Sequence, residues 1–162
     1  MLFIGIDPGE NTGLAVWDSA RREFAFLATL PLHRAMEVVH RYAVGGEYEH
    51  LRQGERVHVV FEDARQRRWF RRERSASEYR GHLMGAGAAK RDAAIWEEYL
   101  TDKKGGIFGR CTYEARAPRA GMTKWTADTF AQVTGYEGRT SGHARDAALL
   151  VYKMTPRAIS MK

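Results

Sequence analysis

The chain has 162 residues, and its 26 lysines and arginines outnumber 20 aspartates and glutamates, which gives a net charge of +6. This length predicts a single domain over residues 1–162 with a core large enough to fold without disulfides. No apolar run approaches the roughly 20 residues that a membrane-spanning helix needs, so we expect no membrane partner. The excess of positive charge favours anionic partners, nucleic acid first.

The first residues and the cysteine content indicate a cytoplasmic protein. Ile6 is followed directly by Asp7, so the start of the chain is typical of a folded strand rather than a signal peptide. The single cysteine, Cys111, can form no internal disulfide, which fits a reducing cytosol. We expect Cys111 to be a small buried residue rather than a reactive thiol.

Strand and helix patterns alternate along the chain. Apolar runs and alternation predict five strands, at 2–7, 13–18, 23–30, 57–62 and 109–116. Helical spacing of apolar residues predicts four helices, at 32–44, 77–100, 123–135 and 142–154. Three antiparallel strands followed by strand–helix alternation predict an α/β fold with a mixed five-stranded sheet flanked by helices. The remaining segments 45–55 and 64–76 are expected to be loops.

Four residues that can bind a metal ion are expected at one edge of this sheet. Asp7 ends the first strand, Glu62 ends the fourth, and His143 and Asp146 share one face of the last helix. Carboxylates suit Mg²⁺ or Mn²⁺, and imidazole leans slightly toward Mn²⁺. Such a set can hold one or two divalent cations, and two cations can promote phosphodiester hydrolysis.

Each of these residues also has a plainer explanation. An aspartate before Pro-Gly is typical of a turn, and Glu62 can be solvated loop charge. His143 fits a surface position, and Asp146 fits an acid that the helix dipole favours near a helix start. Their joint occurrence, with an arginine-rich stretch directly after Glu62, favours the metal site. We expect Gly9 and Gly13 to turn the chain tightly and to keep the space beside Asp7 clear for a phosphate.

The stretch after Glu62 is the strongest candidate for a DNA-binding surface. Six arginines lie between Arg65 and Arg74, and only Glu73 opposes them. Arginines bind phosphates, and aromatic rings stack on exposed bases. The predicted DNA-binding residues are Arg67, Arg68, Trp69, Phe70, Arg71 and Arg72. The alternatives are that the two aromatic residues fold back into the core, or that the arginines form a solvated face with no specific role.

Three motifs give the site a family resemblance. "FIGIDPGENTG" (3–13), "VVFE" (59–62) and "HARDAALL" (143–150), in this order, resemble the RuvC family of Holliday-junction resolvases, in the ribonuclease-H-like superfold. The resemblance spans residues 2–153, and the compact size is similar to a phage-type relative. It implies a homodimeric, metal-dependent endonuclease that cuts two strands of a four-way junction, in the cytoplasm of a bacterial or phage-infected cell.

The resemblance also implies roles for individual residues. Asp7, Glu62, His143 and Asp146 match the catalytic metal ligands of the family, with His143 where many members carry aspartate. Lys124 is similar to a basic residue that precedes the last helix in the family. An aromatic residue in the loop after Glu62 is expected to help open the junction centre. In the helix at 77–100, the small residues fit either a dimer contact or packing within the chain: Gly81, Gly85 and Ala88.

Other classes of protein share part of these features. The turn from Asp7 to Gly13 also resembles the phosphate loop of actin-like ATPases and sugar kinases, in which Gly9 and Gly13 would bring backbone N–H groups to nucleotide phosphates. Those enzymes close two domains around the nucleotide, so we expect no nucleotide cofactor here. A second alternative is a branched-DNA-binding protein of the same fold without catalysis. A third is a nuclease that acts on forks rather than on four-way junctions.

Overall fold

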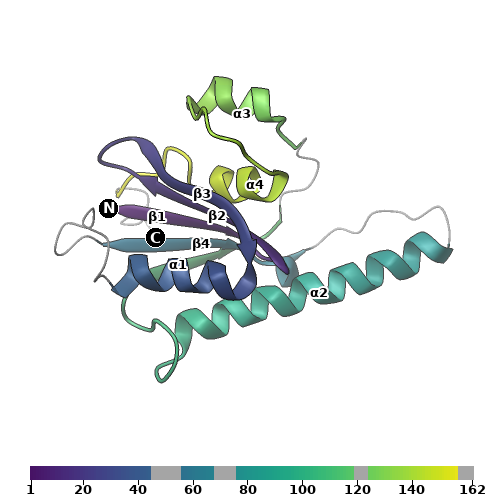
Figure 1. Cartoon of the computed structure of the whole chain (residues 1–162). Helices are drawn as coiled ribbons and strands as arrows, with labels where there is room; N and C mark the ends of the chain where they lie inside the picture. The colour runs from purple at the N-terminus through teal and green to yellow at the C-terminus, as the bar shows by residue number, and fades with distance from the viewer. Residues whose placement is uncertain (45–55, 68–75, 119–123, 157–162) are drawn as a thin grey trace.

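The computed structural model describes residues 1–44, 56–67, 76–118 and 124–156. They form one mixed five-stranded sheet with helices on both faces (Figure 1). The predicted ribonuclease-H-like arrangement, with three antiparallel strands followed by strand–helix alternation, is confirmed. None of the helices in these residues is both long and apolar enough to cross a membrane.

The sheet brings the ends of its parallel strands to one edge. Its strands are β1 (Leu2–Asp7), β2 (Asn11–Asp18), β3 (Glu23–Pro31), β4 (Val57–Glu62) and β5 (Thr112–Arg116). Their order is β3-β2-β1-β4-β5, with β1, β4 and β5 parallel to one another. Ile6 pairs with Phe61 in the register, so the chain positions that follow them, Asp7 and Glu62, end neighbouring strands at the same edge.

The helices divide between the two faces of the sheet. They are α1 (Leu32–Val44), the 3₁₀ helix η1 (Ala64–Gln66), α2 (Ala76–Thr101), α3 (Ala127–Thr134) and α4 (Gly142–Val151). Figure 1 shows α1 and α2 on one face, α4 with α3 on the other, and one end of α2 extending past the sheet.

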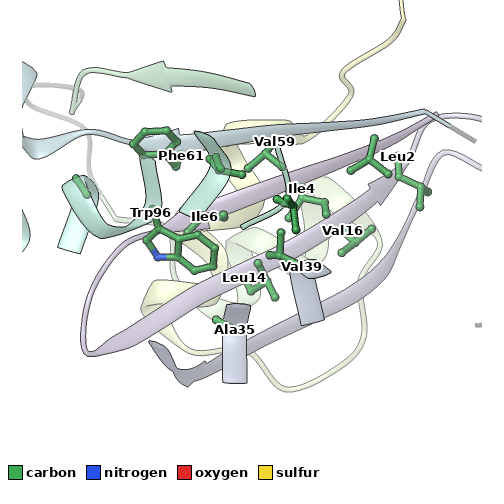
Figure 2. Close-up of a cluster of buried hydrophobic side chains, with 14 residues drawn as sticks. Leu2, Ile4, Ile6, Leu14, Val16, Ala35, Val39, Val59, Phe61 and Trp96 are labelled. Carbon is green, nitrogen blue, oxygen red and sulfur yellow. The ribbon is translucent and has the colours of Figure 1, made fainter. Parts of the chain in front are cut away.

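Alternation along the strands supplies a separate core to each face. Leu2, Ile4 and Ile6 of β1 point to the α1–α2 side, where they share a core with Trp96 of α2. Figure 2 shows Trp96 beside Ile6 at one end of this cluster and Leu2 at the other. Phe3 points to the opposite side and packs with aromatic and small side chains of β2, α3 and α4. Burial on both faces explains why β1 is an almost continuous apolar run in the sequence.

Several element boundaries differ from prediction for local reasons. The strand expected at 109–116 begins only at Thr112, because residues 108–110 form a turn in which Gly109 has a φ of 75° and the Arg110 N–H donates to the Ile107 carbonyl. The helix expected from 123 begins at Ala127, because the Thr126 side chain caps it by accepting the Thr129 N–H. The last helix ends at Val151 rather than 154, since Lys153 adopts a φ of 60°.

The start of α2, the segment before it and the burial of Cys111 also differ from prediction. Within the segment expected as a loop at 64–76, residues 64–66 form η1, and α2 begins at Ala76 instead of 77. The expected loop at 45–55 lies outside the described residues. Cys111 is half-buried against the α1–α2 core instead of fully buried.

Candidate functional site

Asp7 and His143 form the centre of the site. Asp7 ends β1, and its Oδ2 lies 2.8 Å from Nδ1 of His143 at the start of α4. Burial raises the pKa of Asp7 above its ordinary value, and the Asp146 carboxylate adds to that rise. The hydrogen bond and the charge of His143, together with the charge of Lys124, act in the opposite direction without reversing the shift.

Two glycines place α4 directly on the sheet. A Cβ atom at Gly13 would collide with the backbone carbonyl of His143, and one at Gly5 would collide with that of Ala147. The main chain of α4 therefore rests on the main chain of β1 and β2. Gly13 lies inside β2, opposite Asp7 in the register. The side of Gly13 that a Cβ would occupy is filled by α4, so the lack of a side chain there serves helix packing. That it also keeps space clear for a phosphate beside Asp7 stays a prediction.

The first turn of α4 is fixed by a capping serine. The Ser141 side chain accepts the N–H of Ala144, and its hydroxyl also hydrogen-bonds that of Thr29 on β3. The Ser141 cap, its contact with Thr29 and the packing on the two glycines together set the rotation of α4 about its axis. His143 and Asp146, three residues apart, consequently both face the edge that carries Asp7.

Glu62 belongs to the same electrostatic cluster. It ends β4, and burial raises its pKa above the ordinary value, with the carboxylates of Asp7 and Asp146 adding to the rise. The positive charges of Arg67 and Lys124 lower it, but by less. Burial is thus the main reason that the charged form of Glu62 is disfavoured, and the neighbouring carboxylates add to it.

Lys124 contacts the cluster from the segment before α3. Its Nζ lies 2.9 Å from Oδ2 of Asp146, and this contact raises the pKa of Lys124. The carboxylates of Asp7 and Glu62 raise it further. The structure therefore brings all five predicted catalytic residues to one edge of the sheet, although Lys124 had only a loose match in the sequence.

The donor set fits a hard divalent cation, but the side chains are turned toward other partners. Over the described ranges, no three His, Cys, Asp or Glu side chains form a group that could hold a metal ion as they stand. His143 and Lys124 contact Asp7 and Asp146 instead. Three carboxylates nevertheless lie near one another, and the pKa values of two of them, Asp7 and Glu62, are raised. A Mg²⁺ or Mn²⁺ ion would neutralise such a cluster.

Of the predicted DNA-binding residues, only Arg67 lies in the described part of the chain. It follows η1, and its charge acts on Glu62. The other five, Arg68, Trp69, Phe70, Arg71 and Arg72, fall outside the described residues. Their role stays a prediction.

Sequence reasoning missed an ion-pair network directly behind Glu62. Asp63 is buried, and its carboxylate contacts Arg65 Nε at 2.7 Å, while Arg65 Nη2 reaches Glu97 of α2 at 2.8 Å. The N–H of Asp63 also donates to the Arg116 carbonyl at 2.7 Å, which ties this residue to β5. Although burial opposes it, hydrogen bonds from Arg65 and Gln66 lower the pKa of Asp63.

This network fixes the chain immediately after Glu62 to both α2 and β5. Asp63 also serves as the N-cap of η1, a role that an aspartate after a strand often takes. That local signal was readable in the sequence. The pairing of Arg65 with Glu97 was not, because 32 positions separate them and only the packing of α2 brings them together.

The geometry defines an α/β protein with a carboxylate-rich site at the edge of a mixed sheet. No protein-family model matches the chain, and no curated protein matches it significantly.

Proposed function

We propose that the chain is a metal-dependent endonuclease that hydrolyses phosphodiester bonds in four-way junctions and other branched DNA. The observation that carries the proposal is the convergence of Asp7, Glu62 and Asp146, with His143, from three separate elements on one sheet edge. A protein that only binds DNA gains nothing from clustered carboxylates, because they repel phosphates.

The residues divide between holding a cation and handling charge on the substrate. Asp7, Glu62 and Asp146 would hold Mg²⁺ or Mn²⁺, with His143 as an imidazole ligand or as the partner that orients Asp7. The cation would supply an activated water and stabilise the leaving 3′ oxygen. Lys124 carries its ammonium at the same edge, where it can stabilise the negative charge that develops on the phosphate.

Positive charge supports DNA as the substrate. The net charge is +6, and Arg67 lies next to the carboxylates on the chain that leaves β4. We propose that the residues that follow extend this basic surface, with the arginines binding phosphates and the two aromatic rings stacking on unpaired bases. Their full set is Arg67, Arg68, Trp69, Phe70, Arg71 and Arg72.

We also propose a homodimer that uses the projecting part of α2. Met84 is 79% exposed, and, beyond the adjoining residues of the helix itself, no atom of the described chain lies within 4 Å of the positions that a Cβ would take at Gly85 and Gly87. Ala88 is exposed as well. The small residues described in this segment therefore do not pack against another part of the described chain. Sedimentation of Met84→Glu against the unaltered chain tests this: a monomer–dimer shift supports the contact, and identical masses contradict it.

Cleavage of branched DNA is the direct test. The purified chain is incubated with a four-way junction, a fork, plain duplex and single strand, each with Mg²⁺, Mn²⁺ or EDTA. We expect paired nicks in the branched substrates that need the metal. Asp7→Asn should lower the rate by about 100-fold or more, the equivalent of about 2.7 kcal/mol. Glu10→Gln, an exposed acid in the same turn, should cleave like the unaltered chain.

The same assay separates the alternatives. Tight junction binding without nicks in any metal would indicate the non-catalytic DNA-binding protein. Nucleotide hydrolysis without nicks would indicate the actin-like or sugar-kinase class. The kinase-like alternative is disfavoured by Gly13, because α4 covers the backbone that would have to approach a phosphate.

A further inference from the structure

Arg145 ties together the two segments that lead into α3 and α4. It lies on α4 between His143 and Asp146 in the sequence. Its Nε donates to the Trp125 carbonyl at 2.8 Å, and its Nη1 donates to the carbonyl and the hydroxyl of Thr140 at 2.9 and 3.0 Å. All three acceptors are uncharged oxygens, so these hydrogen bonds lie outside the charge cluster itself.

The neighbour of Trp125 in the chain is Lys124, whose ammonium lies at the site. The Lys124 side chain is 73% exposed, and its ammonium contacts Asp146 at 2.9 Å. An ion pair that exposed is weak, because water screens it and a long flexible side chain loses entropy when it is held. The ion pair alone therefore does not explain how the ammonium is kept at the carboxylates. The main chain that carries Lys124 has to be held by something else.

We propose that Arg145 is a positioning residue for Lys124. The guanidinium holds the Trp125 carbonyl against α4, and this places the Cα of Lys124 where its side chain reaches Asp146 one position further along the same helix. An arginine suits the task because its planar fork directs several donors at fixed angles, whereas lysine offers a single flexible ammonium. The consequence for cleavage rests on the proposed function, but the positioning itself does not.

The chemical reactivity of Lys124 tests the positioning without any substrate. The 162-residue chain, free of metal, is treated with a limiting amine-acylating reagent, and the modification rate at each lysine is read by mass spectrometry. An ammonium held by a carboxylate reacts more slowly than a released one. In Arg145→Gln we expect Lys124 to react about threefold faster or more, while the exposed Lys90 and Lys104 keep their rates.

Two further variants make the result specific. Arg139→Gln removes an exposed arginine close to Thr140 in the chain, and it should leave the rate at Lys124 unchanged. Arg145→Lys should give an intermediate rate, because lysine can reach one of the acceptors but not bridge them. An unchanged rate at Lys124 in Arg145→Gln overturns the proposal. If that variant unfolds, all lysines react faster together, and Arg145→Lys then decides by whether the rise is selective for Lys124.

Cleavage kinetics separate this inference from the proposed function. If the chain cleaves junctions, Arg145→Gln should lower kcat by roughly tenfold with little change in KM, since DNA binding does not depend on Lys124 alone. If the unaltered chain cleaves no DNA while Lys124 still shows the selective rise, the proposed function fails and the positioning role stands. If cleavage occurs but the rise is absent, the positioning role fails and the function stands.

Discussion

Gly13→Ala tests whether α4 is seated on the backbone of the sheet. The added Cβ would enter the space of the His143 carbonyl, which is main chain and cannot rotate aside. Either β2 or α4 must move. Overpacking of this kind costs about 1–3 kcal/mol of unfolding free energy. For a chain of this size each kcal/mol lowers Tm by roughly 2–4 °C, so Tm should fall by roughly 2–12 °C.

A matched glycine provides the control for this experiment. Gly85 lies inside α2, and nothing within 4 Å would meet a Cβ there. Gly85→Ala should stabilise the chain by about 0.5–1 kcal/mol, because alanine loses less backbone entropy in a helix. Both variants are measured by thermal and urea unfolding. A Tm for Gly13→Ala equal to or above that of the unaltered chain would refute the close packing, since no relieved contact could offset a real collision.

Three more predictions concern charge and burial. Because burial and repulsion raise the pKa of Glu62, its charge disfavours folding at neutral pH, and this cost disappears as pH falls below the ordinary glutamate range. Metal-free Glu62→Gln should therefore unfold at higher urea than the unaltered chain at neutral pH, and the gain should vanish in acid; a gain that persists in acid would contradict the cause. Arg65→Gln should lower the unfolding free energy by about 1–3 kcal/mol, because it leaves the buried Asp63 carboxylate without its ion pair; equal urea midpoints would show that the network adds no stability. Burial raises the pKa of Cys111 to about 11, so iodoacetamide should modify it slowly in mildly alkaline buffer and rapidly once urea unfolds the chain. Equal rates in both states would argue against burial.

Local sequence patterns predicted most of the helices and strands. The apolar run of β1, the helical spacing of α1 and the run of β4 predicted the bounds 2–7, 32–44 and 57–62, which the structure confirms. Each of these elements is specified by its own residues and their period. The start of α3 was predicted too early, because Thr126 caps the helix, which begins directly after it. The sequence alone does not show whether such a cap or the helix propensity of the preceding residues prevails.

The site was predictable to the extent that it depends on strand ends and helix faces. Asp7 and Glu62 follow from the parallel register, and His143 with Asp146 follows from a three-residue spacing. The contacts that align these groups were not predictable. Arg145 donates to the carbonyl of Trp125, which lies 20 positions earlier in the chain. The periodicity of a single helix or strand does not predict a contact between a side chain and so distant a carbonyl.

Because α4 lies directly on Gly5 and Gly13, its position relative to Asp7 does not depend on the volume of side chains at those two contacts. Where a helix rests on side chains, every change of volume beneath it shifts the helix and whatever it carries. Here the contact is main chain against main chain, so the distance from β1 to α4 is set by atoms that every residue shares. The apolar side chains that also pack between α4 and the sheet, such as Phe3 and Val151, add stability to a spacing that the two glycines set. Any side chain at Gly5 or Gly13 would enlarge that spacing and move His143 and Asp146 away from Asp7.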